Sequence, residues 1–273
     1  MSAAPSQPVE ARGAPASRGV AGPLTDQAPR SGRRRSLGGY LFMPVLLLAI
    51  LAALYLWVSS KELGSIEQSR INASSILGNL REHMTLTLAS TVLVLVIAIP
   101  VGVLLTRPFA RTITPPAIAV FNIGQAVPSI GVIALFALTI GIGFSPVVIA
   151  LVAYSMLPVL RNTMVGLEQV DASVIESARG MGMTKTGVLT RIELPLAVPV
   201  IMAGLRTALT INVGTAALAA LVGAGGLGEL IVSGIVQNRQ VILVVGAVLV
   251  AVLALFVDYL AGIAEDVLRP RGL

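Results

Sequence analysis

Charged residues are scarce in this sequence, and cysteine is absent. Only 12% of the 273 residues are charged, about half of the roughly 25% typical of soluble domains, while 55% are hydrophobic. This composition indicates a protein that folds in lipid rather than in water. The lack of cysteine excludes disulfides, thiolate metal sites and cysteine nucleophiles. The single histidine, His83, follows Glu82 in a stretch typical of a polar loop, and we expect it to be solvated.

Other features of enzymes and nucleotide-binding proteins are also missing. No Gly-Lys dipeptide occurs, so the chain has no Walker A loop to hold phosphates. The sequence shows no pairing of a nucleophile with a base and no cluster of metal ligands, so nothing in it suggests an enzyme. The formal net charge of +6 would suggest nucleic acid as the partner of a soluble protein. In a membrane protein the distribution of these charges matters more than their sum, and we expect no nucleic acid to bind.

Long apolar runs take the place of these features. Each approaches the ~20 residues that a helix needs to cross a hydrocarbon core of about 30 Å. Unbroken runs such as TVLVLVIAIPVGVLL argue against a β-barrel. We therefore predict an all-α polytopic membrane protein with about six transmembrane helices, and a cytoplasmic loop of short helices between two of them. The expected spans are 40–58, 84–106, 116–140, 144–160, 196–222 and 240–264.

The charges between the spans predict the topology. Taking the N-terminus as cytoplasmic, the inner segments hold fourteen Lys and Arg residues and the outer loops hold four. This asymmetry follows the positive-inside rule, so both termini are expected in the cytoplasm. The basic cluster RSGRRRS lies too far from the N-terminus for a signal peptide and suits a cytoplasmic tail better. The expected regions are a disordered basic tail (1–38), a first span with an external loop (39–83), a transmembrane core (84–265) and a C-terminal tail (266–273).

The longest cytoplasmic loop, 161–195, contains a polar, Gly-punctuated segment, ESARGMGMTKTGVLTRIELPLA. Asp171 can cap a first short helix, and glycines at 180 and 182 permit a turn after it. A second short helix can start at Thr184, and Pro195 ends it or opens the next span. The apolar positions at helical spacing are Val174, Ile175 and Ala178, then Val188, Leu189 and Ile192. Two small apolar faces of this kind suit docking into a groove of a partner.

This segment resembles the EAA signature of ABC importer permeases: Glu-Ala-Ala, three residues, Gly, nine residues, Ile, one residue, Leu-Pro. The corresponding positions are Glu176, Ser177, Ala178, Gly182, Ile192, Leu194 and Pro195, with serine replacing one alanine. The resemblance implies coupling helices that sit in a cleft of a separate ATPase subunit, which binds the ATP and Mg, so this chain needs no cofactor of its own. It also implies that Glu176 contacts the ATPase or caps the helix, that Ala178 permits close approach, and that Gly182 makes the bend. The last three positions would anchor the loop to the next span.

The resemblance extends beyond this loop to the osmoprotectant branch of the family, over about 80–265. The segments that carry it are NIGQAVPSIG, LPVLRNTMVGLEQVDASVIESARGMGM and GTAALAALVGAGGLGELI. It implies import of glycine betaine, choline, carnitine or a related quaternary amine across a bacterial inner membrane. It also implies an extracytoplasmic binding protein and a second permease copy or paralogue as partners, beside the lipid. Aromatic residues, which form cages for quaternary ammonium groups, make up only 4% of the chain, so selectivity is expected in the binding protein. Because the chain ends at Leu273, we expect that protein to be a separate polypeptide.

Two weaker features lie in or near the later spans. GAGGLG matches a dinucleotide-binding pattern, but it follows a membrane span rather than a strand, so an external turn near the binding protein is expected instead. The residues of that turn are Gly223, Gly225, Gly226, Gly228 and Glu229. Arg206 and Asp258 are charged residues within expected spans, and we predict that they pair. Arg206 could instead snorkel to the cytoplasmic face.

Two alternatives remain open from the sequence. The same machine could import another small solute, such as methionine or a polar amino acid. An ATP-independent carrier is the third class, although it would not require the spacing of the coupling loop.

Overall fold

The computed structural model describes residues 37–268. Nearly all of the predicted basic tail, and the last residues of the predicted C-terminal tail, lie outside this range. Within it the chain forms helices and no strands. The elements are α1 (Leu37–Ser59), α2 (Ser65–Arg70), α3 (Ala73–Leu105), η1 (Pro108–Ala110), α4 (Thr114–Ala126), α5 (Ser129–Ile140), α6 (Phe144–Glu168), α7 (Ala172–Gly180), α8 (Lys185–Val188), η2 (Leu189–Glu193), α9 (Leu194–Ala216), η3 (Ala217–Val222), α10 (Gly228–Val236) and α11 (Gln240–Leu268).

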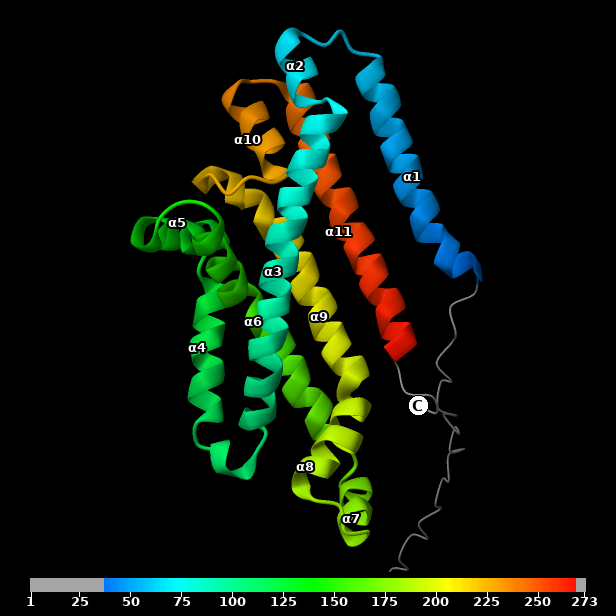
Figure 1. Cartoon of the computed structure of the whole chain (residues 1–273), viewed down its shortest axis with the longest axis vertical. Helices are drawn as coiled ribbons and strands as arrows, with labels where there is room; N and C mark the ends of the chain where they lie inside the picture. The colour runs from blue at the N-terminus through cyan, green and yellow to red at the C-terminus, as the bar shows by residue number, and fades with distance from the viewer. Residues whose placement is uncertain (1–36, 269–273) are drawn as a thin grey trace, which may run out of the picture.

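The centre of the molecule is a bundle of α3, α6 and α9, with α11 packed against α9 (Figure 1). Glycine allows two of these helices to approach closely. At Gly204 of α9 an added Cβ atom would lie 2.8 Å from the carbonyl oxygen of Pro158 in α6. At Gly166 of α6 it would lie 3.1 Å from the Cβ of Ala197. Small residues at such crossings give the close backbone packing that holds membrane helices together.

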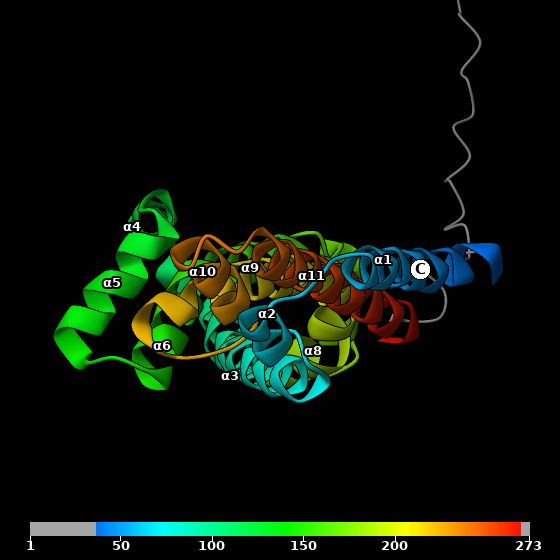
Figure 2. The same cartoon turned by 90° about the horizontal axis from the view of Figure 1, so that it is seen from above.

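Helix α1 flanks the bundle on one side, and the helices α4 and α5 flank it on the opposite side (Figure 2). Helix α1 lies along α11, and the Tyr259 hydroxyl donates to the backbone oxygen of Tyr40 at 2.9 Å. Only 6% of the apolar stretch of α1 is buried, so most of its surface suits contact with lipid. On the other side, α4 and α5 pack against α6.

The predicted span 116–140 is not a single straight helix. The structure has two helices there, α4 and α5, with an angle of 95° between them. The break falls at Val127, whose backbone is extended (φ −73°, ψ 133°), and at Pro128. Proline lacks a backbone donor and disfavours helical geometry in the residue before it, and here that residue is extended, so the helix ends. Among residues 37–268, five helices are long and apolar enough to cross a membrane, or six if this bent pair counts as one.

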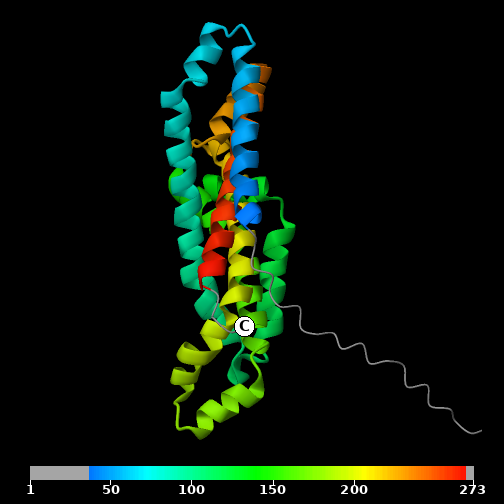
Figure 3. The same cartoon turned by 90° about the vertical axis from the view of Figure 1, so that its right-hand side faces the viewer.

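Helix α3 begins well before the predicted start at residue 84. Asn72 caps it, its side-chain oxygen accepting from the backbone N–H of Ser75 at 2.8 Å. At the end of the molecule where α3 starts, α2 and α10 cover the bundle, whereas α7 and α8 extend beyond the opposite end (Figures 1 and 3). Helix α6 also continues into the predicted loop 161–195, as far as Glu168. The segments singled out in the sequence therefore lie at the two ends of the bundle.

Candidate functional site

Two short helices, α7 and α8, form the loop that extends beyond the bundle. Asp171 caps α7, and its Oδ1 atom accepts from the backbone N–H of Ser173 at 2.8 Å. Thr184 caps α8, its Oγ1 atom accepting from the backbone N–H of Gly187 at 3.1 Å. These caps satisfy donors that the first turn of a helix leaves without partners, which stabilises helices with little core of their own.

The carboxyl group of Asp171 has a pKa below its ordinary value. The main cause is the hydrogen bond that the carboxylate accepts from the backbone N–H of Ser173. The ionised form is therefore the capping form at neutral pH, and its negative charge also lies favourably at the positive end of the helix.

The turn between α7 and α8 depends on one glycine. Gly182 has φ +87°, in the region that residues with a side chain rarely adopt. Its N–H donates to the carbonyl of Arg179 at 3.0 Å, and the N–H of Met183 donates to the carbonyl of Ala178 at 3.1 Å. An added Cβ at Gly182 would meet no atom within 4 Å. Glycine is therefore required here by the backbone conformation and not by a lack of space for a side chain. Gly180, the other glycine predicted to shape the turn, ends α7 without a positive φ.

Of the residues in α7 that match the EAA signature, one is buried and two are exposed. Ala178 is 1% exposed, whereas Glu176 and Ser177 are exposed and Met181 at the tip is 77% exposed. Asp171 is the residue that caps this helix, and Glu176 lies within it. Of the two roles expected for Glu176, contact with a partner therefore fits its position better than capping.

Helix α8 continues directly into the membrane bundle. It passes through a π-helical turn, η2, and enters α9, where Pro195 is the second residue. Because proline has no N–H to complete the regular helical pattern, a π turn just before it is a natural accommodation. Ile192 and Leu194 are partly buried, and Leu194 packs against a core cluster that includes Leu167 and Ile201.

An ion pair that the sequence reasoning missed links this turn to α3. Glu193 of η2 accepts from Nη2 of Arg107 at 2.7 Å, and the Glu193 side chain is only 9% exposed. The Nε atom of Arg107 donates to the backbone oxygen of Val103 at 3.2 Å, which orients the guanidinium. In the sequence, Arg107 served only as a charge for the topology. The available signal was a charged residue, Glu193, between the apolar signature positions 192 and 194.

The glycine-rich segment at the other end of the bundle forms a tight turn between η3 and α10. Gly223, Gly225 and Gly226 have φ values of +69°, +78° and +91°. Helix α10 begins at Gly228, where an added Cβ would overlap the backbone of Ala217, and Glu229 lies in its first turn. The turn is attached to α3 by one hydrogen bond, in which the Gly226 N–H donates to Oε2 of Glu82 at 2.9 Å.

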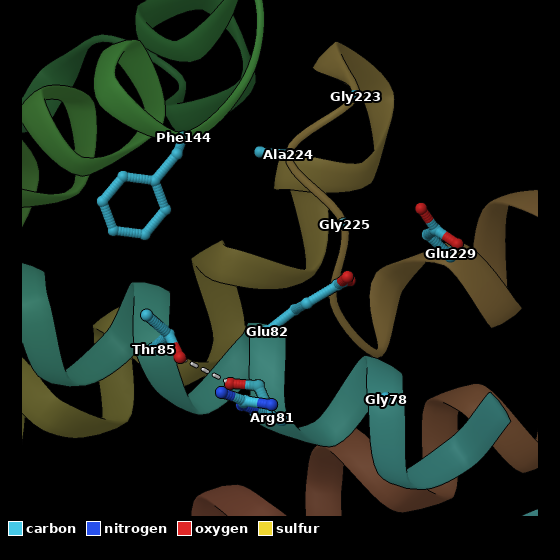
Figure 4. A pocket seen from close by; sticks show the side chains of 9 residues that line it. All are labelled: Gly78, Arg81, Glu82, Thr85, Phe144, Gly223, Ala224, Gly225 and Glu229. Atoms are coloured by element: carbon cyan, nitrogen blue, oxygen red, sulfur yellow. Dashed lines mark hydrogen bonds between the residues drawn. The ribbon is translucent and has the colours of Figure 1, made fainter. Parts of the chain in front are cut away.

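A pocket of about 490 Å³ lies beside this turn (Figure 4). It is bounded by the first turns of α3, the start of α6, the glycine-rich segment and the start of α10. The residues that line it are Gly78, Arg81, Glu82, Thr85, Phe144, Gly223, Ala224, Gly225 and Glu229. The pocket thus combines one arginine, two glutamates and one aromatic ring in a space large enough for a small solute.

The expectation of a solvated loop histidine is wrong. His83 lies within α3 and is fully buried. Its Nε2 atom donates to the backbone oxygen of Val213 in α9 at 2.9 Å. Its Nδ1 atom faces the glycine-rich turn, where an added Cβ at Gly226 would lie 3.2 Å away. The prediction failed because the polar residues around position 83 belong to the first turns of a longer helix, α3, which packs there against the glycine-rich turn and α9.

The structure brings Arg206 of α9 and Asp258 of α11 together. Nε and Nη2 of the guanidinium donate to Oδ1 and Oδ2 of Asp258, each at 3.0 Å. Nη1 also donates to Oε2 of Glu265 at 3.1 Å. Sequence reasoning missed Glu265, although its spacing of about two helical turns from Asp258 places both carboxylates on one face of α11. The role of this cluster in transport stays a prediction.

The helices long enough to cross a membrane, with a short two-helix loop extending from one end of the bundle, form the architecture that the sequence predicted for an importer permease. The chain belongs to the family of binding-protein-dependent transport system inner membrane components, whose model matches residues 98–270. It is 41% identical over 204 residues to the choline transport system permease protein OpuBB of Bacillus subtilis (strain 168), covering 74% of this chain and 92% of that protein. It is also 41% identical over 215 residues to the osmoprotectant import permease protein OsmY of Salmonella typhimurium (strain LT2), and this match covers 79% of this chain and 89% of that protein.

A solved structure supports the fold independently. The inward-facing MetNI methionine ABC transporter has a chain that matches with a TM-score of 0.64 and 24% identity, covering 71% of this chain and 96% of that chain. The resemblance to ABC importer permeases that the loop predicted is therefore confirmed. The chain is a multi-pass inner-membrane transport subunit.

Proposed function

We propose that this chain is the transmembrane subunit of an ATP-driven importer of quaternary-amine osmoprotectants. Its solutes are glycine betaine, choline or carnitine, delivered by an extracytoplasmic binding protein. The observation that carries the choice of solute is the identity of about 40%, over nearly three quarters of the chain, to a choline permease and to an osmoprotectant permease. A permease for glycine betaine, carnitine and choline, OpuCB of Bacillus subtilis (strain 168), is 38% identical over 202 residues.

The α7–α8 loop receives the force of ATP hydrolysis in this proposal. A partner ATPase binds ATP and Mg and holds the exposed edge of α7, with Glu176 and Met181 in its cleft. Movement of the ATPase displaces the loop, and the π turn carries the displacement into α9. The Arg107–Glu193 ion pair carries it into α3 at the same time. Support for this role comes from the loop's position beyond the bundle and from its small, well-capped helices.

The orientation in the membrane follows from this role. The α7–α8 end of the bundle faces the cytoplasm, together with both termini, and the glycine-rich turn faces the binding protein. A second permease, either a copy of this chain or a paralogue, completes the pathway. The exposed apolar side chains of α1 contact lipid.

Uptake of labelled solutes tests the proposal. The gene would be expressed with its ATPase and binding protein in cells that lack their own osmoprotectant transporters. We expect uptake of glycine betaine or choline that needs all components and that only quaternary amines compete. An inactive ATPase is the matched control, because it preserves assembly while removing hydrolysis. Uptake that persists with this ATPase would refute the coupling role and favour an ATP-independent carrier.

Import of methionine or a polar amino acid is the second candidate. The chain of a methionine transporter shares this fold at 24% identity, which leaves the solute open, so competition between solutes decides. Uptake competed by amino acids and not by quaternary amines would select this candidate, and it would leave the role of the α7–α8 loop intact.

A further inference from the structure

The pocket beside the glycine-rich turn collects groups of opposite charge around one space. Arg81 and Glu82 come from α3, Phe144 from the start of α6, and Glu229 from the first turn of α10 (Figure 4). In the figure, the Phe144 ring and the Glu82 carboxylate approach the space from different helices. With two carboxylates and one guanidinium, the pocket offers one more negative charge than positive charge.

We propose that this pocket binds a small zwitterion that carries a quaternary ammonium group and a carboxylate. The inference rests on the proposed function and adds a solute site within the permease itself. The ammonium group lies between the two carboxylates and the face of the Phe144 ring, which attracts cations through its quadrupole. The solute carboxylate binds the guanidinium of Arg81, whose planar donors match a carboxylate with two parallel hydrogen bonds.

The geometry around Glu82 makes it a fixed part of the site. One of its oxygens accepts from the Gly226 N–H at 2.9 Å, and an added Cβ at Gly225 would overlap the carboxylate. The turn therefore packs against this carboxylate, and glycine at 225 leaves it room. A solute cation drawn to Glu82 lies directly beside the turn. The site is placed where the glycine-rich turn meets α3, at the end of the bundle opposite the α7–α8 loop.

Recognition by Arg81 has a consequence that separates two solutes. Glycine betaine has a carboxylate, whereas choline has a hydroxyl group in its place and carries only the positive charge. Loss of the arginine should therefore affect the zwitterion and spare the cation. Loss of a glutamate should affect both, because both have the ammonium group.

Equilibrium binding to the permease–ATPase complex in lipid nanodiscs, without binding protein, tests this inference. The probes are labelled glycine betaine and labelled choline. We expect Arg81→Gln to weaken glycine betaine binding about tenfold, the effect of losing one charge-assisted contact, and to leave choline binding unchanged. Glu229→Gln should weaken both. Arg70→Gln and Glu62→Gln are the matched controls, since these exposed residues precede α3 in the chain and do not line the pocket; neither should change binding.

The outcomes separate the pocket from the proposed function. If the wild-type complex imports quaternary amines but does not bind free glycine betaine, or if Arg81→Gln weakens both probes equally, the pocket inference is wrong and the function stands. If Arg81→Gln raises only the concentration of binding protein needed for half-maximal uptake, the pocket is a docking surface and the inference is also overturned. If the wild-type complex imports amino acids instead, both the proposed solute class and the proposed ligand of the pocket are wrong.

Discussion

Substitution of Gly182 by alanine isolates the backbone requirement of the turn between α7 and α8. The new Cβ would meet no atom within 4 Å, so no packing change contributes to the effect. The cost comes from φ +87°, a left-handed geometry that is disfavoured for a residue with a side chain by roughly 1–2 kcal/mol. If the strained loop relaxes into another turn in the free permease, the competent geometry becomes less populated. A cost of that size corresponds to roughly 5- to 30-fold weaker binding of the ATPase.

The assay is titration of the purified ATPase onto the permease in nanodiscs, with membrane insertion checked separately. Gly180→Ala is the matched control, because Gly180 lies in the same loop, is also exposed and likewise has open space around it, but has no positive φ. We expect the control to bind the ATPase as the wild type does. Equal affinities for the two variants would refute the reasoning. A bulkier residue at 182 that still binds the ATPase and supports normal uptake would refute the role of the loop as well.

Three further substitutions test contacts within the bundle. Glu193→Gln removes the ion pair to the end of α3 and should lower the free energy of unfolding by about 1–3 kcal/mol, measured by thermal unfolding in detergent; an unchanged unfolding temperature would contradict the strength assigned to the pair. Gly204→Ala should destabilise the protein by about 1–3 kcal/mol because its Cβ would lie 2.8 Å from the backbone of α6, whereas Gly214→Ala in the same helix meets nothing and should not. Arg206→Asp should reduce the yield of folded protein, and adding Asp258→Arg should restore part of it; no recovery would count against a pairing that matters for folding.

The sequence was most informative where a local rule decides the structure. Capping by Asp171, the start of a second short helix near Thr184 and the turn at Gly182 follow from side chains and backbone preferences within a few residues. The ion pair between α9 and α11 was also predictable, because a charge inside a membrane span needs a partner and few others were present. The family resemblance then joined these local features to a function that physical chemistry alone did not supply.

The features that the sequence did not predict depend on packing between distant segments. The sequence around His83 resembles a loop because its neighbours are polar, although α3 begins before the apolar run and includes them. Only the approach of α9 and of the glycine-rich turn buries His83. The bend between α4 and α5 was visible as irregular sequence around Pro128, but its angle depends on how the two halves pack against α6. The pocket beside the glycine-rich turn combines residues from separate helices, so no spacing in the chain could predict it.

Helix α3 connects the two candidate sites physically. Near one end, Glu82 holds the glycine-rich turn beside the solute pocket, and just beyond the other end Arg107 holds the turn that follows α8. The backbone hydrogen bonds of a helix are internal, so a displacement at one end tends to move the whole element as a unit. Pro100 interrupts that pattern within α3, but Gly102 packs tightly against Thr163 of α6 just after it, which limits bending at this point. We therefore expect movement of the α7–α8 loop to reach the solute pocket chiefly through α3 moving against α6.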